Sequence, residues 1–353
     1  MRLLSRYVLS RYVQPMVFSS AAFVAIFIVA DLANRISAFL DREVGLASIA
    51  AYYAWSIPYF SLVTLPMASL LASLFCLGGL ARQNELVAMK SAGIPLLRIV
   101  APVLAFAALV SAIALGLSLN AIPFANRHRA SFDEGAQRVT SGRRAQVVVR
   151  DVGGRVLTLA EYLPEQTLGR RATLDRYEGR ALSRKVRAEE IVWVDSVWVF
   201  VRGETRTFRE REMVVPFDSL AVPALTLKPP DLSRESRSAD QLSHQALVQL
   251  IERRVRNGGE ALRERVDLEL RSSFACAAFV MVLLGVPLSS YTRRAGRPLQ
   301  VGVCLLTSFV FYGAIQASRA MGWNGILDPV VAAWAPNAVF LAVGILMFRR
   351  AHK

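Results

Sequence analysis

Cysteine is scarce in this chain of 353 residues, and its placement is as informative as its number. The three cysteines are Cys76, Cys276 and Cys304. All of them lie in apolar segments, so the charged middle of the chain has no cysteine. This middle region must therefore fold without a disulfide, whichever compartment it occupies.

Residues that commonly carry catalysis are equally sparse. The three histidines are His128, His244 and His352, and they show no HExxH or other paired metal-ligand spacing. The sequence has no Walker A motif or glycine-rich phosphate loop, and Gly285 to Ser289 does not match a nucleophile elbow. We therefore expect a chain that is not an enzyme, with no cofactor and no metal site of its own.

Charge is missing from six long apolar stretches. They lie within residues 12–30, 44–81, 99–126, 272–292, 298–318 and 329–348. Each can supply the roughly 20 mostly apolar residues that a bilayer-spanning helix needs. The stretch from Arg127 to Arg271 carries charges every few residues and cannot enter lipid. The predicted fold class is an α-helical membrane protein with six transmembrane helices, three before and three after an inserted soluble domain.

Positive charge predicts the orientation of these helices. The net charge is +15, and much of the excess flanks the apolar segments, which favours contact with anionic lipid over nucleic acid. Basic residues mark the N-terminus, the loops at 82–98 and 293–297, and the C-terminal tail. If six helices cross in sequence, all four regions share one side, which the positive-inside rule makes cytoplasmic. The middle domain then lies in the periplasm of a Gram-negative inner membrane. The first apolar run is too long for a signal peptide, so we interpret it as a retained helix.

The middle region is predicted to be mostly β-strand. Short β-rich runs occur at 145–150, 155–160, 186–193, 196–202 and 204–208, with turn residues at 151–154, 195–196 and Gly203. Strands without intervening helices suggest an antiparallel, jelly-roll-like domain. We place this domain at 127–230, a linker and juxtamembrane helix at 231–265, and the membrane helices at 1–126 and 266–353. The spacing of Leu242, Ala246 and Leu250 predicts the juxtamembrane helix.

The segment 82–95 forms a predicted short helix between the second and third membrane helices. Gly93 is expected to end the helix, and Pro95 prevents its continuation. An exposed cytoplasmic helix carrying Glu85 is suited to dock into a groove on a cytosolic partner and to pair with a basic residue there. The alternative interpretation is an interfacial loop helix whose charges simply face water.

A group of cations is predicted at the outer ends of the first and third membrane helices. Arg35 shares a helix face with Asp31 and Asn34, and Arg127 and Arg129 follow the third helix. These arginines can present bidentate donors to an anionic lipid headgroup or a sugar phosphate. The alternative is ordinary snorkelling together with an Asp31–Arg35 pair.

Several motifs resemble those of the LptF/LptG permeases, the membrane subunits of the lipopolysaccharide export ABC transporter. The most specific match is the segment 85–93, ELVAMKSAG, which is similar to the coupling helix of that family. Supporting matches are LPM at 65–67, VPLS at 286–289 followed by the basic loop 294–297, and the Pro329, Trp334, Pro336 and Asn337 pattern. The resemblance covers nearly the whole chain.

The resemblance implies roles for individual residues. Glu85 corresponds to the glutamate that contacts the ATPase subunit LptB, within a coupling surface that also contains Arg82, Met89 and Gly93. The lipopolysaccharide-binding residues are then expected to be Arg35, Arg127 and Arg129. Asp31 stands where LptG has a cation, whereas the length and short tail look more like LptG. Whether the chain is LptF-type or LptG-type stays open.

The resemblance also implies partners. They are an LptB-type ATPase dimer that holds the ATP and Mg²⁺, a second LptF/LptG-type permease, LptC/LptA-type periplasmic proteins, lipopolysaccharide and membrane lipid. The function expected is extraction of lipopolysaccharide from the inner membrane and its transfer to periplasmic bridge proteins. The alternative from another class is a non-transporting membrane sensor or scaffold with a ligand-binding β domain.

Overall fold

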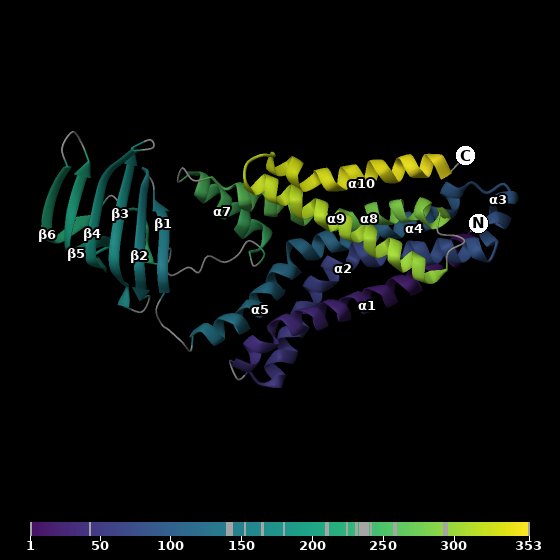
Figure 1. Cartoon of the computed structure of the whole chain (residues 1–353), viewed down its shortest axis with the longest axis horizontal. Coiled ribbons are helices and arrows are strands. Elements are labelled where there is room, and N and C mark those ends of the chain that lie inside the picture. Colours follow the sequence, from purple (N-terminus) through teal and green to yellow (C-terminus); the bar gives the residue numbers. More distant parts are fainter. Residues whose placement is uncertain are drawn as a thin grey trace. The chain divides into compact units, whose positions relative to one another are not determined.

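The computed structural model contains a helical unit and a β domain, which are described separately (Figure 1). It describes residues 2–41, 44–138, 144–151, 153–163, 166–178, 181–208, 212–223, 225–229, 232, 240, 242–256, 260–291 and 296–351. Arg293 and Arg294 of the predicted basic loop lie outside these residues.

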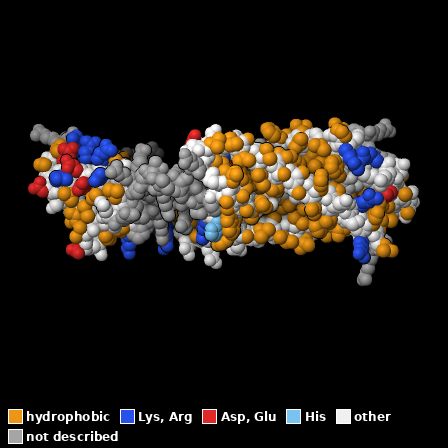
Figure 2. Space-filling model, turned by 90° about the horizontal axis from the view of Figure 1, so that it is seen from below, with side chains coloured by type: hydrophobic (Ala, Val, Ile, Leu, Met, Phe, Trp, Pro, Cys, Tyr) orange, Lys and Arg blue, Asp and Glu red, His pale blue; other side chains and the backbone are white. Residues whose placement is uncertain are grey.

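Six helices are long and apolar enough to cross a membrane, as the sequence predicted. They are α1 (Arg2–Asp41), α2 (Leu46–Arg82), α4 (Leu96–Leu119), α8 (Leu262–Tyr291), α9 (Arg297–Trp323) and α10 (Pro329–Ala351). Both chain termini and the short helix α3 (Glu85–Ser91) lie at the same end of the helical unit (Figure 1). Figure 2 shows a broad band of hydrophobic side chains over this unit, with Lys and Arg side chains gathered at that end.

The central helices of this unit are α2 and α8. In each, 67% of the most apolar stretch is buried, against 17–33% in the other four membrane helices. The backbones of α2 and α8 approach closely at Gly285, where a Cβ atom would lie 1.9 Å from Ser73 Oγ. Small residues permit such close helix packing in lipid, where dispersion rather than the hydrophobic effect drives helix association. The outer helices consequently present most of their apolar side chains to the surroundings.

One predicted boundary differs from the structure. The third apolar segment was expected to run to Asn126 with the β domain following it directly. Instead α4 ends at Leu119, and a second helix, α5 (Ala121–Arg138), continues past the predicted boundary. Asn120, at φ −122° and ψ −57°, interrupts the helical run between them. The helix predicted near Leu242 is α7 (His244–Arg256).

The inserted domain is an antiparallel β-sheet. Its strands are β1 (Arg144–Asp151), β2 (Arg155–Leu163), β3 (Leu168–Glu178), β4 (Ala181–Val194), β5 (Val197–Phe208) and β6 (Glu212–Val222). An antiparallel β domain was predicted correctly, but the strand order is not that of a jelly roll. The described strands form one sheet in sequence order, because each pairs with the next through a short connection and no strand crosses to a second sheet.

A row of irregular residues crosses this sheet. One residue on each of the six strands is left out of the pairing, although its neighbours on both sides are paired. These residues are Gln146, Ala160, Arg171, Glu189, Arg202 and Asp218. Arg171 and Arg202 both have a φ of 50°, which few non-glycine residues adopt. The pairing register is the same on both sides of the row, so no residue is inserted there.

Across this row, the alternation of buried and exposed side chains along each strand changes phase. In β2 the buried residues are Leu157 and Leu159 before the row and Tyr162 after it. In β4 they change from Ala188 to Ile191 in the same way. Strict alternation would turn one half of each strand toward water. The row therefore lets both halves of long strands contribute to one apolar core.

The segment after β6 covers this core. Leu225 and Leu227 are buried with the strand residues, and Leu227 accepts a 2.7 Å hydrogen bond from Trp198 Nε1. The buried Asp151 carboxylate accepts a hydrogen bond from the backbone N–H of Thr226 at 3.3 Å and another from its hydroxyl group. The segment that follows β6 is thus held against the sheet by hydrogen bonds to residues of β1 and β5.

Candidate functional site

The helix α3 is built by local sequence signals. Gly93 has a φ of +78°, and its N–H donates to Lys90 O at 3.0 Å, while the Ile94 N–H donates to Met89 O at 3.1 Å. This pair of bonds is the Schellman motif that glycine favours at a helix C-terminus. Pro95 then begins the approach to α4 with extended backbone angles. The helix end predicted at Gly93 is confirmed.

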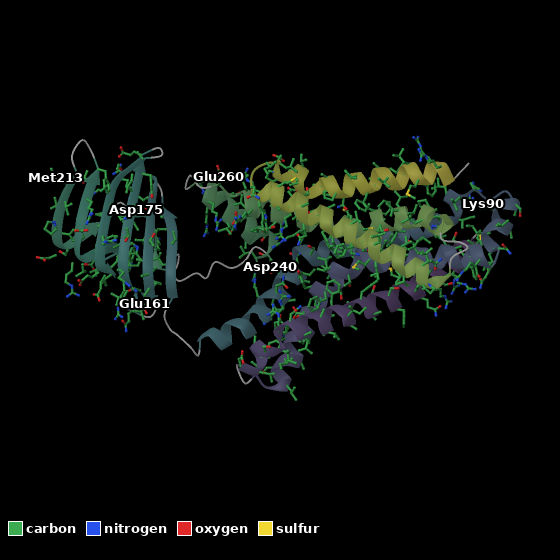
Figure 3. The ribbon with its side chains drawn as sticks, viewed as in Figure 1. Lys90, Glu161, Asp175, Met213, Asp240 and Glu260 are labelled. Atoms are coloured by element: carbon green, nitrogen blue, oxygen red, sulfur yellow. The ribbon has the colours of Figure 1, made fainter. Side chains whose placement is uncertain are left out.

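One side of α3 packs against the membrane helices and the other is exposed. Leu86, Met89 and Ile94 pack against the buried cluster that includes Leu80 and Leu96. Met89 is therefore an anchoring residue of α3 in this chain as well as a predicted member of its coupling surface. Val87 and Lys90 of α3 are exposed, as are Arg82 at the end of α2 and Gly93 just after α3. Figure 3 labels Lys90, a residue of α3, at the end of the helical unit.

Glu85 is held by the first membrane helix. The Tyr7 hydroxyl group lies 2.9 Å from Glu85 Oε2 and 3.1 Å from Oε1, and donates its hydrogen to this carboxylate. The same hydroxyl oxygen accepts hydrogen bonds from Arg11 Nη2 at 2.9 Å and from Arg11 Nε at 3.2 Å. Neither Tyr7 nor Arg11 was predicted from the sequence to be a site residue. Because they are four residues apart, the sequence indicates that Tyr7 and Arg11 share one face of a helix. It does not indicate that this face contacts α3.

Arg35 lies between an acidic and an aromatic side chain. Arg35 Nε is 3.3 Å from Asp31 Oδ1, and the guanidinium carbon is 5.4 Å from the centre of the Tyr52 ring. Asp31 also accepts a 3.2 Å hydrogen bond from the Tyr53 hydroxyl group. The side chain of Arg35 remains 39% exposed, so it stays accessible to an anion while it is paired. The Asp31–Arg35 pair anticipated as the simple alternative is therefore present.

Arg129 of α5 lies over the ring of Tyr59, which belongs to α2 as Tyr52 does. Its guanidinium carbon is 4.9 Å from the centre of the Tyr59 ring, and His128 stacks on Trp55 at 4.6 Å. Arg127 is exposed and, like His128, has further interactions of its own. The structure therefore places Arg129 and His128 of α5 against aromatic residues of α2.

The aromatic residues that meet these cations follow a helical spacing. Tyr52, Trp55 and Tyr59 are separated by three and four residues, which places them on one stripe of α2. Tyr52 contacts Arg35 from α1, and Tyr59 contacts Arg129 from α5. Seven residues of helix correspond to about 10 Å along the axis, so the two cation–aromatic contacts are separated by about two helical turns. The cations were predicted from the sequence, but the aromatic stripe beneath Arg35 and Arg129 was not.

A second polar cluster joins α8 and α9. Arg319 Nη2 and Nε donate to Asp267 Oδ1 at 2.8 and 3.0 Å, and Trp323 Nε1 lies 3.3 Å from the same oxygen. The Arg319 guanidinium also stacks over the Trp323 ring at 4.3 Å. This pair satisfies two charges on membrane-spanning helices, where an unpaired charge is costly. Within the described residues, no group of three His, Cys, Asp or Glu side chains is arranged to hold a metal ion.

Six apolar helices in two groups of three, with an antiparallel β domain between them, define a multi-pass membrane protein with a soluble inserted domain. The chain belongs to the LptF/LptG permease family, because the family described as "Lipopolysaccharide export system permease LptF/LptG" matches residues 6–350. A curated relative is the lipopolysaccharide export system permease protein LptF of Escherichia coli strain K12. It is 21% identical over 340 residues, which cover 91% of this chain and 88% of the relative. The LptF of Shigella flexneri matches with the same identity and coverage.

Proposed function

We propose that this protein is a permease subunit of an ABC transporter that extracts lipopolysaccharide from the inner membrane and passes it to periplasmic bridge proteins. The observation that carries the proposal is the family match over residues 6–350. The chain is a transport subunit, and ATP and Mg²⁺ are bound by a separate LptB-type ATPase dimer. The N- and C-termini are cytoplasmic, and the β domain is periplasmic.

The coupling surface is the exposed side of α3. Glu85 contacts the ATPase, with Arg82, Met89 and Gly93 as the other predicted members of this surface. Its support is the placement of α3 at the end of the helical unit where both termini lie, with Arg82 and Lys90 exposed (Figure 1). A half-buried glutamate beside exposed cations suits a partner surface of mixed charge. Closure of the ATPase dimer displaces α3 and thereby the membrane helices that pack against it.

The lipid-binding surface is formed by cations above the aromatic stripe of α2. Arg35, Arg127 and Arg129 bind phosphate groups of lipopolysaccharide, while the exposed apolar faces of the outer helices accept its acyl chains. Tyr52 and Tyr59 support this role because they hold two of the guanidinium groups over α2. A second LptF/LptG-type permease completes the enclosure around the lipid.

The β domain shields the acyl chains during transfer to LptC/LptA-type proteins. Exposing an acyl chain to water costs about 0.8 kcal/mol per methylene group, so a continuous apolar route is required. The support is the apolar core of the curved sheet, to which both halves of its long strands contribute. Edge strand β6 also exposes Met213, Val214 and Val215 (Figure 3 labels Met213).

Copurification tests the proposal as a whole. The full-length tagged chain, extracted from its own membranes in mild detergent, should bring down an ATP-binding subunit and a second permease. After reconstitution into proteoliposomes, the complex should release lipopolysaccharide to an added periplasmic acceptor only in the presence of ATP and Mg²⁺. A chain that purifies alone and leaves lipopolysaccharide in the vesicles would contradict the transport function and favour a sensor or scaffold.

A further inference from the structure

The hydrogen bonds around Tyr7 connect two elements that are far apart in the sequence. Tyr7 lies near the start of α1, and Glu85 is the first residue of α3, 78 positions later. The Tyr7 hydroxyl group donates to the Glu85 carboxylate and accepts from the Arg11 guanidinium group. A hydroxyl group that accepts from a cation becomes a stronger donor to an anion, because hydrogen bonds in a chain polarise one another. The three side chains therefore form one ordered relay.

This relay lies at the end of α1 that packs against α2 and α4, where Val8, Tyr12 and Met16 are buried. In the most apolar stretch of α1 only 17% of the residues are buried, the lowest share among the six membrane helices of the described chain. At its N-terminal end, however, Tyr7 packs against the same buried cluster as Leu86 and Met89 of α3. The first helix is thus fastened beside α3 by packing and by a charge-assisted hydrogen bond.

We propose that Tyr7 is a positioning residue for Glu85, which orients the carboxylate for docking and couples displacement of α3 to α1. The inference rests on the proposed coupling role of α3. With the hydroxyl donor in place, one carboxylate orientation is favoured and fewer rotamers must be frozen when a partner cation arrives. When the ATPase moves α3, the relay moves the cytoplasmic end of α1 with it. Arg11 supports the relay by fixing the direction of the Tyr7 hydroxyl group.

The test uses Tyr7→Phe, which removes one oxygen atom and keeps the packed ring. In the complete permease–ATPase complex in nanodiscs, this variant should lower the affinity for the ATPase about tenfold, since a hydrogen bond to a charged group is worth roughly one such factor. Glu85→Gln should lower it at least as much. The double variant should be no weaker than Glu85→Gln alone, because the hydroxyl group acts only through the carboxylate.

Two matched variants separate positioning from general damage. Arg11→Gln should lower the affinity in the same direction as Tyr7→Phe, by a smaller factor. Arg6→Gln removes an exposed charge from the same helix, outside the relay, and should leave the affinity unchanged. All variants should insert into the membrane at wild-type levels, since none of them opens the apolar core.

A distance measurement tests the coupled motion directly. Spin labels at Leu3 and at Ala92 just after α3, both exposed, report the separation of α1 and α3 in a background without the native cysteines. Their distance distribution should stay narrow when the ATPase binds nucleotide, and it should broaden in Tyr7→Phe. Wild-type affinity and a narrow distribution in Tyr7→Phe, with Glu85→Gln still impaired, would overturn the positioning role alone. Tighter binding in Tyr7→Phe would also overturn it, because the hydroxyl group would then be competing with the ATPase. Wild-type affinity in Glu85→Gln would overturn the coupling role of Glu85 itself.

Discussion

Two side chains with expected binding roles, Glu85 and Arg35, already interact with other side chains of the same protein. Glu85 projects from an exposed helix, yet Tyr7 holds its carboxylate. Arg35 is partly exposed, yet it is paired with Asp31. A partner that binds either residue must compete with these contacts or share them. Carboxylate and guanidinium groups can share, because each has several acceptor or donor positions.

Replacing Glu85 by Ala should uncouple the ATPase and leave folding intact. The side chain lies on a short helix whose anchoring residues are apolar, so its loss creates no cavity in the membrane core. Loss of one member of a docked charge pair costs about 2–5 kcal/mol of binding free energy. We expect normal membrane insertion, reduced ATPase copurification and reduced lipid export. Full export by a normally assembled Glu85→Ala complex would show that Glu85 does not dock.

The proposed role of Arg35 and Arg127 in lipid binding should be tested by charge reversal. Arg35→Glu together with Arg127→Glu should reduce photocrosslinking of lipopolysaccharide to neighbouring positions, since each charge-assisted contact contributes about 1.5–3 kcal/mol. Glu at position 35 would also lie one helical turn from Asp31, and the repulsion would open this site further. The ATPase should still assemble with the double variant.

Two controls accompany the charge reversal. The double Arg→Lys variant keeps the charge and loses only the bidentate geometry, so its effect should be milder. Arg349→Glu with Arg350→Glu changes the net charge equally at the exposed end of α10, and crosslinking should be unaffected. If the Arg35 and Arg127 reversal leaves crosslinking unchanged as well, both arginines are ordinary interfacial charges.

At the scale of elements, close backbone approaches determine how the helices pack. Gly322 of α9 faces two other helices: a Cβ atom there would lie 2.6 Å from Ala332 Cβ of α10 and 2.8 Å from Val266 Cγ2 of α8. Gly313 of the same helix has open space around it. A side chain at Gly322 would therefore collide with neighbouring helices, whereas one at Gly313 would not.

Gly322→Ala should destabilise the contact among α8, α9 and α10 by about 1–3 kcal/mol, the usual cost of overpacking. Gly313→Ala should be neutral or slightly stabilising, because alanine has the higher helix propensity and meets no neighbour. Thermal unfolding of both variants in the same detergent measures the difference. Ala332→Gly should partly restore the stability of Gly322→Ala, and equal melting temperatures for the two single variants would refute this packing.

The strands of the β domain show why sequence patterns located them only partly. The pattern around Gly203 was interpreted as a break between two strands, but β5 runs through it from Val197 to Phe208. A Cβ atom at Gly203 would lie 2.2 Å from Arg187 O, so glycine is needed for close strand approach there. β3 and β6 were missed. In β3 the buried residues change phase at Arg171, and this change removes the period of two that identifies a strand.

At the scale of the whole molecule, the predicted topology can be tested by labelling. A cysteine at exposed Ser196, in the β4–β5 turn, should react with a membrane-impermeant thiol reagent in cells with a permeabilised outer membrane. A cysteine at exposed Ser91, in α3, should react only after the inner membrane is opened. The native cysteines lie within membrane-spanning helices and are replaced in the parent chain. The reverse labelling pattern would invert the topology and remove the basis for ATPase docking at α3.

The sequence by itself determined the six membrane helices, the inserted antiparallel domain and the position of α3. These features depend on local properties: an apolar run long enough for a bilayer, strands linked by short turns, and a glycine followed by a proline. The roles assigned to Glu85 and the arginines came from family resemblance. Only the tertiary structure decided that Tyr7 holds Glu85 and that α2 carries the aromatic stripe under Arg35 and Arg129. It also decided that the sheet is a meander whose buried residues change phase along one row. Each of these depends on which helix or strand becomes a neighbour, and periodicity within one segment carries no information about the face of another.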